Sequence, residues 1–497
     1  MATAPLGNAF IRYPDRMFIG GAWVKPSTDA KIDVIAPATE EIFLSVAEAQ
    51  EADVNRAVAA AREAFDHGPW PRMSHAERAA YLRAIGRKIE ERAGDIARAW
   101  PNEMGMLYSI AQPSAAGLGS VYDYYASLAE TYPFCERRVP GLAGGGGVGL
   151  LVREAVGVVA AIVAWNGSPV MIAYKCAPAL LAGCTVVIKP SPEAPSAAYV
   201  MAEVCEAVGL PKGVVNFITA DRAVSELLVR HSGIDKVSFT GSSAVGKRIA
   251  AICGERIARC TLELGGKSAA IVLDDYDVRV AAESISQSAR LLTGQVCSSL
   301  TRIVVDRSRH DDLVESLSES FRKIRVGDPF DPQTEMGPLA MRRQRERVEN
   351  FIAKGCEEGA TLATGGGRPA HLNRGFFIEP TVFANVDNRS TIAREEIFGP
   401  VISVIPSDGE SHAIEIANDS PYGLNASVFT NDSRRAYAVS RRLRSGTVGH
   451  NGFRTDGSIA FGGFKQSGIG REGGVEGLLP YLETKTVLLD EEPGAFD

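Results

Sequence analysis

The chain has 497 residues, which is too long for a single hydrophobic core, so two or three domains are expected. Its apolar content of 45% and its 50 glycines are typical of an α/β protein with many tight loops. A net charge of −7 argues against nucleic-acid binding, which requires a basic face.

Cysteine spacing and hydropathy indicate in which cell compartment the protein is expected. The eight cysteines contain no CxxC pair and no zinc spacing, so we expect reduced thiols, no metal site and a cytoplasmic protein. The first fifteen residues lack the apolar region of a signal peptide. The longest apolar run, residues 156–165, is shorter than the roughly 20 residues that span a bilayer. No membrane association is expected.

The N-terminal part of the chain predicts strands and helices whose role is to pack against the rest of the protein. Residues 17–24 predict a hairpin around Gly20-Gly21, and a strand follows near Ile32–Ile35. Apolar residues at helical spacing predict helices over Ala52–Phe65 and Ala76–Arg98. Nothing in these helices indicates chemistry.

A glycine run and the C-terminal tail form a separate pair of features. The run 144–147 lies between strand-like segments within residues 139–152. A flexible loop and a protruding hairpin for subunit contact fit this composition about equally well. Near the other end, residues 481–489 alternate like an edge strand.

The middle of the chain alternates strands and helices, which predicts parallel pairing in a doubly wound sheet. Strands are expected over 156–164, 185–188, 214–218 and 236–239, and helices over 169–182, 196–208, 224–230 and 244–252. Ligands of such sheets bind beyond the carboxyl ends of the strands. The candidate loops are therefore 165–168, 189–195 and 240–246.

A second alternating set predicts a second domain. Asp277 is expected to cap a helix over 278–292. Other expected elements are strands over 269–273, 302–305, 375–382 and 401–405, and a helix over 313–324.

The loop 240–248 nearly matches the phosphate-binding loop of NTPases. Arg248 stands where that loop has the Ser or Thr that binds magnesium. A strand, a glycine turn and a helix N-terminus still make an anion site through backbone N–H groups. A nucleotide-binding protein or NTPase using Gly241–Lys247 stays an alternative, which magnesium-dependent ATP hydrolysis would support.

Glu263 and Cys297 are the candidate chemical groups. Glu263 lies among small and apolar residues beside Gly265-Gly266, a dry setting that raises proton affinity and suits a general base. Cys297 follows Gly294 in a short turn, where a thiol can reach a substrate. A covalent intermediate on the cysteine then needs water to release it. Taken alone, Cys297 could be an inert buried thiol and Glu263 a surface acid. The two residues together with their neighbouring glycines favour a catalytic role.

Taken together, four motifs resemble those of the aldehyde dehydrogenase superfamily. They are Leu262–Ser268, Gly294–Ser299 with its cysteine 34 residues after the glutamate, E-E-I-F-G-P at 395–400, and the C-terminal segments 461–468 and 470–472. The resemblance runs from about Phe18 to Gly474. It implies NAD(P)-dependent oxidation of an aldehyde to a carboxylic acid through a cysteine thiohemiacetal and thioester, in a homodimer or homotetramer, and it supports the hairpin as a subunit contact.

The resemblance also implies roles for individual residues. The implied catalytic residues are Cys297, Glu263, Asn166 as oxyanion donor, and Lys175 with Glu472 as a proton relay, for which surface ion pairing is an equal alternative. The implied cofactor-binding residues are Trp165, Lys189, Ser191, Gly241, Ser242, Gly246, Leu264, Glu396 and Phe398. The implied substrate tunnel consists of Gly167, Val170, Met171, Tyr174, Val296 and Phe461, with Arg454 and Asp456 nearby.

Two departures from the family pattern bear on specificity. Pro192 stands where members strict for NAD often carry a glutamate, so NAD is expected and NADP stays open; Glu193 follows directly. Gly167 stands where the family often has an aromatic residue, which favours a roomy tunnel and a medium or large hydrophobic aldehyde.

Further alternatives and the domain boundaries complete the expectations. A CoA-acylating dehydrogenase usually lacks the glutamate, so Glu263 counts against it, and the Cys–Glu–Asn set counts against a crystallin-like structural protein. We expect a doubly wound parallel-sheet cofactor domain, a second α/β catalytic domain and a small β oligomerisation element. Their respective ranges are 1–134 with 154–265, then 266–476, then 135–153 with 477–497.

Overall fold

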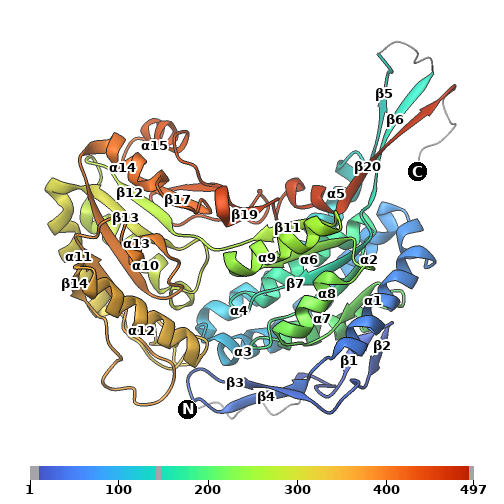
Figure 1. Ribbon diagram of the computed structural model, residues 1–497, viewed down its shortest axis with the longest axis horizontal. Helices are drawn as coiled ribbons and strands as arrows, with labels where there is room; N and C mark the ends of the chain where they lie inside the picture. The colour runs from blue at the N-terminus through green and yellow to red at the C-terminus, as the bar shows by residue number, and fades with distance from the viewer. Residues whose placement is uncertain (1–9, 142–146, 492–497) are drawn as a thin grey trace.

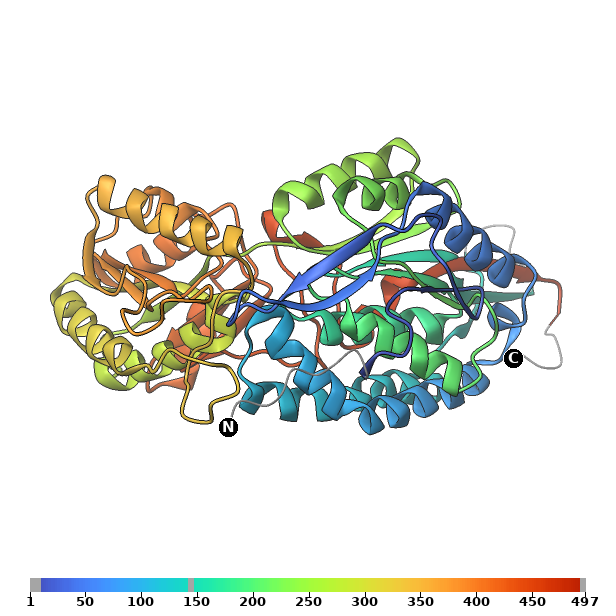
Figure 2. The same ribbon diagram turned by 90° about the horizontal axis from the view of Figure 1, so that it is seen from below.

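The computed structural model describes residues 10–141 and 147–491, and it places them in two α/β lobes with a small sheet that extends from one of them (Figures 1 and 2). Of the predicted glycine run, Gly144–Gly146 lie outside the described residues. None of the helices in the described ranges combines the length and apolar character needed to cross a membrane.

The first lobe is built on an eight-stranded sheet in the order β19-β11-β10-β7-β8-β9-β1-β2. The five strands from β11 to β9 are parallel, which confirms the predicted doubly wound sheet. The N-terminal hairpin is also confirmed, with Phe18 opposite Trp23. The strands are β1 (Met17–Ile19), β2 (Ala22–Val24), β7 (Val158–Ile162), β8 (Thr185–Lys189), β9 (Val215–Phe217), β10 (Lys236–Thr240), β11 (Arg259–Glu263) and β19 (Gly468–Ile469).

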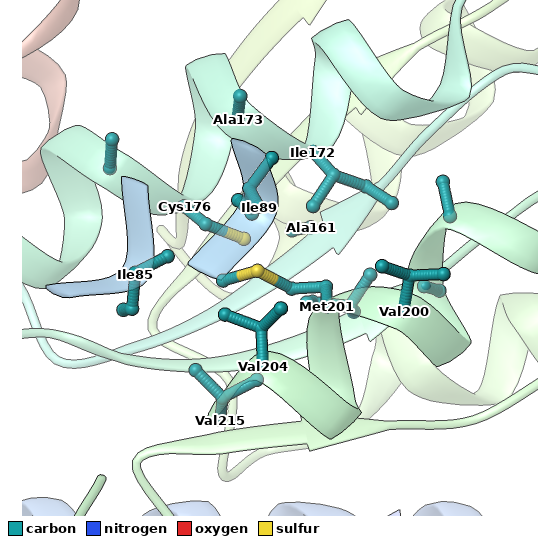
Figure 3. Close-up of a cluster of buried hydrophobic side chains, with 14 of the residues drawn as sticks. Ile85, Ile89, Ala161, Ile172, Ala173, Cys176, Val200, Met201, Val204 and Val215 are labelled. Carbon is teal, nitrogen blue, oxygen red and sulfur yellow. The ribbon is translucent and has the colours of Figure 1, made fainter. Parts of the chain in front are cut away.

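Helices cover both faces of this sheet because its strands are apolar on both sides. In β7, Val159 and Ala161 join one core with α2, α6 and α7, whereas Val158 and Ala160 join another with α1, α8 and α9. Figure 3 shows Cys176 of α6 beside Met201 of α7 in the first of these cores. The helices are α1 (Glu51–Asp66), α2 (His75–Glu91), α3 (Ala93–Met104), α4 (Tyr108–Ala116), α5 (Gly119–Thr131), α6 (Ser168–Ala182), α7 (Ser196–Ala207), α8 (Arg222–Arg230) and α9 (Ser243–Glu255).

The single helix expected over Ala76–Arg98 is wrong, because α2 and α3 are separate helices that meet at Arg92. The Arg92 side chain binds Glu203 of α7 at 2.6 Å and donates to the Phe10 carbonyl at 2.7 Å. These long-range partners fix the break, and no local sequence pattern contains them.

The second lobe is built on a seven-stranded sheet in the order β14-β15-β16-β13-β12-β17-β18. All neighbouring pairs are parallel except β14 with β15. The strands are β12 (Ser268–Val272), β13 (Leu300–Asp306), β14 (Thr361–Thr364), β15 (Thr381–Ala384), β16 (Val401–Ser407), β17 (Asn425–Phe429) and β18 (Thr447–His450). The helices are α10 (Val278–Arg290), α11 (His310–Lys323), α12 (Arg342–Glu357), α13 (Thr391–Arg394), α14 (Gly409–Asn418) and α15 (Ser433–Ser440).

Two local predictions in this lobe have opposite outcomes. Asp277 caps α10 as predicted, accepting from the Arg279 and Val280 N–H groups at 2.8 and 3.1 Å. The strand predicted over 375–382 is wrong for its first six residues, since β15 begins only at Thr381. Phe376 instead donates to the Pro37 carbonyl at 2.9 Å, outside the sheet.

Two smaller sheets complete the fold. β3 (Lys31–Ile35) and β4 (Ile42–Ala47) form an antiparallel pair. β20 (Leu482–Leu489), β6 (Val148–Ala155) and β5 (Cys135–Arg138) form an antiparallel sheet in that order, so β20 is an edge strand, as predicted. This sheet projects from the body of the molecule beside α5 (Figure 1).

Candidate active site

Cys297 lies in the loop between a short 3₁₀ turn at Leu291–Gly294 and β13. Leu292, Thr293 and Gly294 all have left-handed backbones, with φ of 50°, 56° and 71°. Such angles cost energy for residues other than glycine, so the surroundings must hold them. The Thr293 hydroxyl donates to the Gly337 carbonyl at 3.0 Å. The sharp turn brings Cys297, half-buried, to the wall of a cavity.

Glu263 is the last residue of β11, opposite Thr240 of β10. Its backbone carbonyl accepts from the Gly241 N–H at 3.0 Å. The side chain is 3% exposed, and neither carboxylate oxygen has a hydrogen-bond partner within residues 10–141 and 147–491. Burial, and then the charge of Glu472, raise its pKa well above the ordinary value, whereas Lys175 and Arg471 oppose that shift. A carboxylate in this setting is a strong base once it ionises.

One cavity of about 440 Å³ contains both Cys297 and Glu263. All six predicted tunnel residues line it, and so does Asp456; Arg454 does not. A larger cavity of about 670 Å³, against residues 321–328, contains neither the thiol nor the base.

Other lining residues were missed by the sequence reading. They include Trp100 of α3, Ile110 of α4 and Met106 between those helices, which together supply much of the apolar wall. Their helices read as packing elements, and only the tertiary fold brings them to the cavity. No local signal in the sequence distinguishes them from core residues.

The thiol of Cys297 is held in its neutral form in the free site. Burial, then the carboxylates of Glu396 and Glu263, raise its pKa to about 12. At neutral pH the thiolate therefore requires a positive charge or a base that opposes these carboxylates.

Asn166 lies beside the nucleophile loop, 6% exposed. Its side-chain Nδ2 donates to the Gln295 backbone carbonyl at 2.9 Å. Its backbone carbonyl accepts from Trp100 Nε1 at 3.3 Å. A side-chain amide has two N–H groups, so one remains for an oxyanion.

Lys175 and Glu472 form a buried ion pair. The Lys175 side chain is fully buried, and its Nζ lies 2.5 Å from Glu472 Oε1. The alternative of surface ion pairing is therefore wrong. Glu472 also lines the cavity that holds Cys297 and Glu263.

The anion loop has the predicted local form. Ser242 caps α9, its Oγ accepting from the Val245 N–H at 3.4 Å. A Cβ on Gly246 would lie 2.3 Å from Leu264 Cδ2, so only glycine lets the first turn of α9 pack this closely. The Gly241 N–H already donates to the Glu263 carbonyl, so the N–H groups of Ser242 and Ser243 at the start of α9 are the ones that could bind an anion.

Lys189 ends β8 at the same sheet edge and is 6% exposed. Burial lowers its pKa to about 8, against the opposing charge of Glu193. The Ser191 hydroxyl donates to Glu193, which also pairs with Arg343. Burial favours the neutral acid, but Arg343 and Ser191 outweigh it and hold the pKa of Glu193 below its usual value.

The glycine pair after Glu263 permits two close approaches. A Cβ on Gly265 would lie 2.4 Å from Glu396 Oε2, and one on Gly266 would lie 2.2 Å from the Cys297 carbonyl. The Gly266 N–H donates to Glu396 Oε1 at 3.2 Å. Burial raises the pKa of Glu396 to about 7.

Phe398, two residues further on, has a left-handed backbone with φ of 62°. Its ring meets Trp165 edge to face at 5.2 Å. Gly266 contacts both Glu396 and the Cys297 carbonyl, so the glutamate lies close to the nucleophile loop.

Comparison with known proteins agrees with this geometry. The geranial dehydrogenase of Castellaniella defragrans is 44% identical over 95% of this chain and 98% of its own. An aldehyde dehydrogenase of Mycobacterium tuberculosis, solved with NAD⁺, is 46% identical with a TM-score of 0.93 and covers 97% of this chain and 99% of its own. A cysteine-to-alanine mutant of aldehyde dehydrogenase C from Pseudomonas syringae, solved with NAD⁺ and octanal, is 39% identical with a TM-score of 0.92, covering 96% and 98%. Because residues 23–487 also match the aldehyde dehydrogenase family as a whole, the chain belongs to that family.

Proposed function

We propose that the protein oxidises a medium-sized or large hydrophobic aldehyde to its carboxylic acid, with NAD as the hydride acceptor. The observation that carries this proposal is the cavity that contains Cys297 and Glu263 and is otherwise lined mainly by apolar side chains. A largely apolar pocket with polar groups at a few points selects an apolar substrate and orients it at its polar end.

In this reaction the Cys297 thiolate adds to the aldehyde carbon and forms a thiohemiacetal. The free N–H of Asn166 Nδ2 and the Cys297 backbone N–H steady the oxyanion. When bound, NAD would supply a positively charged ring that favours the thiolate and would serve as the hydride acceptor. The resulting thioester on Cys297 is attacked by a water whose proton Glu263 takes, and the acid leaves as the thiolate is restored.

The same argument assigns the cofactor site. The backbone N–H of Ser242 at the start of α9, with Gly246 and Leu264 packed behind it, would bind the pyrophosphate, and Gly241 would shape the turn while its own N–H stays on the Glu263 carbonyl. Lys189 and Ser191 would hold the adenosine ribose, and Glu396, Phe398 and Trp165 would hold the nicotinamide end.

Preference for NAD over NADP rests on Glu193. This carboxylate stands beside Lys189 and is kept ionised by Arg343 and Ser191. A fixed negative charge there would repel the 2′-phosphate of NADP. Glu193 would thereby take the place of the glutamate that NAD-specific members often carry at the position of Pro192.

Relatives support the substrate class. Of the three relatives named above, one is a geranial dehydrogenase and another was solved with octanal, and both of these aldehydes are apolar. Asp456, Thr455 and Ser114 add polar points to the lining, so a polar group on the substrate has partners as well.

We also propose the domain organisation expected from the sequence: 1–134 with 154–265 for the cofactor, 266–476 for catalysis, and 135–153 with 477–497 for assembly into a homodimer or homotetramer in the cytoplasm. The projecting sheet β5-β6-β20 supports the assembly element.

The test is a panel of straight-chain, branched, aromatic and semialdehyde substrates, each assayed with NAD and with NADP, without CoA. We expect acid as the product, with kcat/KM highest for hydrophobic aldehydes and for NAD. Cys297→Ser should lose nearly all activity, whereas Cys356→Ser, at an exposed thiol of α12, should lose none. Activity of Cys297→Ser above a few per cent of wild type would refute the nucleophile.

Glu263→Gln separates the two halves of the reaction. Without the base, turnover should fall about 100-fold or more. The first NADH per site should still form, because hydride transfer precedes hydrolysis. Loss of the first turnover in this variant would remove Glu263 from the hydrolytic role.

A further inference from the structure

A line of buried polar groups runs behind the active site from Glu472 to the start of β20. Lys175 Nζ contacts Glu472 Oε1 at 2.5 Å and donates to Ser238 Oγ at 3.3 Å. The Tyr481 hydroxyl donates to the same Ser238 Oγ at 3.2 Å. Ser238 is 0% and Tyr481 2% exposed. The four residues come from four places in the fold: the C-terminal segment, α6, β10 and the turn before β20.

The contacts explain how a buried ammonium is tolerated. An ion pair removed from water is costly unless its remaining protons find acceptors. Glu472 satisfies one N–H of Lys175, and Ser238 satisfies a second. Ser238 Oγ accepts from both Lys175 and Tyr481, so both of its acceptor positions are used.

Tyr481 is itself fixed on several sides. Its carbonyl accepts from the Val156 N–H at 3.0 Å and from Cys184 Sγ at 3.5 Å. Lys236 Nζ lies 5.0 Å from the centroid of its ring and donates to Thr261 Oγ1 at 2.7 Å. The tyrosine is therefore a rigid support for Ser238, which in turn supports Lys175.

This line of polar groups matters for catalysis because Glu472, at one end of it, faces the proposed base Glu263. Glu472 lines the cavity with Glu263, and its charge raises the pKa of Glu263, whereas Lys175 lowers it. Where the ammonium sits therefore decides how much of the Glu472 charge reaches Glu263.

We propose that Ser238 and Tyr481 are positioning residues for thioester hydrolysis, which fix Lys175 against Glu472 and so set the charge that Glu263 faces when it activates water. The inference rests on the proposed function, in which Glu263 is the hydrolytic base. Ser238 and Tyr481 touch neither substrate nor cofactor in this role.

Other titratable groups border this cluster and define its electrostatic setting. They are Arg471 near Glu263, Tyr125 of α5 and Tyr174 of α6 near Glu472, Lys236 of β10 near Lys175, Cys176 beside Lys175, and Cys297 near Glu263. Of these, Arg471 and Lys236 are cations like Lys175, Arg471 acting on Glu263 and Lys236 on Glu472. None of these groups contacts Ser238 Oγ among the hydrogen bonds of the described chain.

The sign of the pH effect follows from the base. Glu263 acts only when deprotonated, so turnover rises as pH passes upward through its pKa. Removing the Ser238 acceptor loosens the ammonium that offsets Glu472, which raises the pKa of Glu263 further. Ser238→Ala and Tyr481→Phe should therefore move the acidic limb of kcat to higher pH by about one unit and lower kcat near pH 7 about tenfold. Turnover should recover as the pH is raised.

The measurements are the pH profile of kcat and the burst of NADH in the first turnover. The burst should keep its wild-type amplitude in both variants, since hydride transfer precedes hydrolysis. Ser238→Thr keeps the hydroxyl and should restore the wild-type profile. Tyr199→Phe is the matched control: it removes another buried tyrosine hydroxyl, bonded to the Pro14 and Arg16 carbonyls, and should leave the profile unmoved.

A double variant tests whether Ser238 acts through Lys175. Lys175→Met alone should shift the limb in the same direction, and Ser238→Ala added to it should change nothing more. If the fold-losses of kcat in Lys175→Met and Ser238→Ala multiply in the double variant, the inference is overturned. It is also overturned if the acidic limb of kcat stays at its wild-type pH in both Ser238→Ala and Tyr481→Phe. If Ser238→Ala does not fold, Tyr481→Phe carries the same test. Failure of Glu263→Gln to block turnover would instead overturn the proposed function.

Discussion

Gly167 is the residue that we expect to set how much of the cavity a substrate can use. A Cβ built at this position meets only Met171 Cε, at 3.5 Å, which is ordinary van der Waals contact. Gly167 itself lines the cavity, one residue after Asn166. A larger side chain here therefore needs no movement of the main chain and projects into the space that the substrate would occupy.

We expect Gly167→Phe to reverse the preference for long or branched aldehydes. The ratio of kcat/KM for a ten-carbon aldehyde to that for propanal should fall about tenfold or more, since a filled pocket excludes added methylenes. Steady-state kinetics with both substrates measures this ratio. Gly94→Phe, on α3 where a Cβ would have no atom within 4 Å, should leave the ratio unchanged. An unchanged ratio in Gly167→Phe would mean that substrates approach by another wall.

At the scale of elements, two left-handed turns carry the two halves of the site, and a buried glutamine holds each. Gln295 donates from Nε2 to the Leu292 carbonyl and accepts at Oε1 from the Ala340 N–H, both at 2.9 Å. Gln344 donates from Nε2 to the Phe398 carbonyl at 2.7 Å, and to that of the preceding residue at 3.1 Å. The first turn precedes the nucleophile and the second belongs to the proposed nicotinamide site.

The two glutamines should therefore fail in different ways. Replacing either with alanine leaves buried backbone groups unpaired, which costs about 1–3 kcal/mol of stability. Gln295→Ala should lower kcat and slow alkylation of Cys297 by iodoacetamide, with the KM for NAD little changed. Gln344→Ala should raise the KM for NAD and leave alkylation of the free enzyme near wild type. Thermal unfolding, alkylation and kinetics on the pair serve as mutual controls, and identical kinetic defects would show that the turns are not separable.

Sequence periodicity predicted the elements whose contacts are local or regular. The alternation from residue 156 onward predicted the parallel sheet. The sequence did not identify Glu396 and the Cys297 carbonyl as the groups that approach the glycines beside Glu263. The helix break at Arg92 and the irregular segment before Thr381 were not predicted, because the residues that hold them, Glu203 and Pro37, are distant in the sequence.

The candidate site shows the same division. Its charged and nucleophilic members stand in short motifs, so the sequence could name them. Trp100, Met106 and Ile110 stand in none, and they reach the cavity only because α3 and α4 pack against it. The share of the apolar wall that comes from α3, α4 and the residues between them is thus the part that sequence alone could not provide.

For the whole molecule, the projecting sheet is the feature that a single chain does not account for. β20 pairs with β6 along eight residues, yet both outer strands, β20 and β5, leave an unpaired edge in the described chain. Leu488 on β20 is 68% exposed. An apolar residue on an open strand edge is a hazard for aggregation unless another surface covers it. A second copy of the chain is the occupant expected for this family.

Light scattering after size exclusion tests this assembly. The wild-type protein should have two or four times the chain mass of 53.0 kDa. Leu488→Asp should shift the mass toward that of one chain, because it places a charge in an apolar contact. Leu362→Asp is the matched control, an exposed leucine on β14 at the edge of the other sheet, and should leave the mass unchanged. A monomeric wild type, or an undisturbed Leu488→Asp oligomer, would remove β20 from the subunit contact.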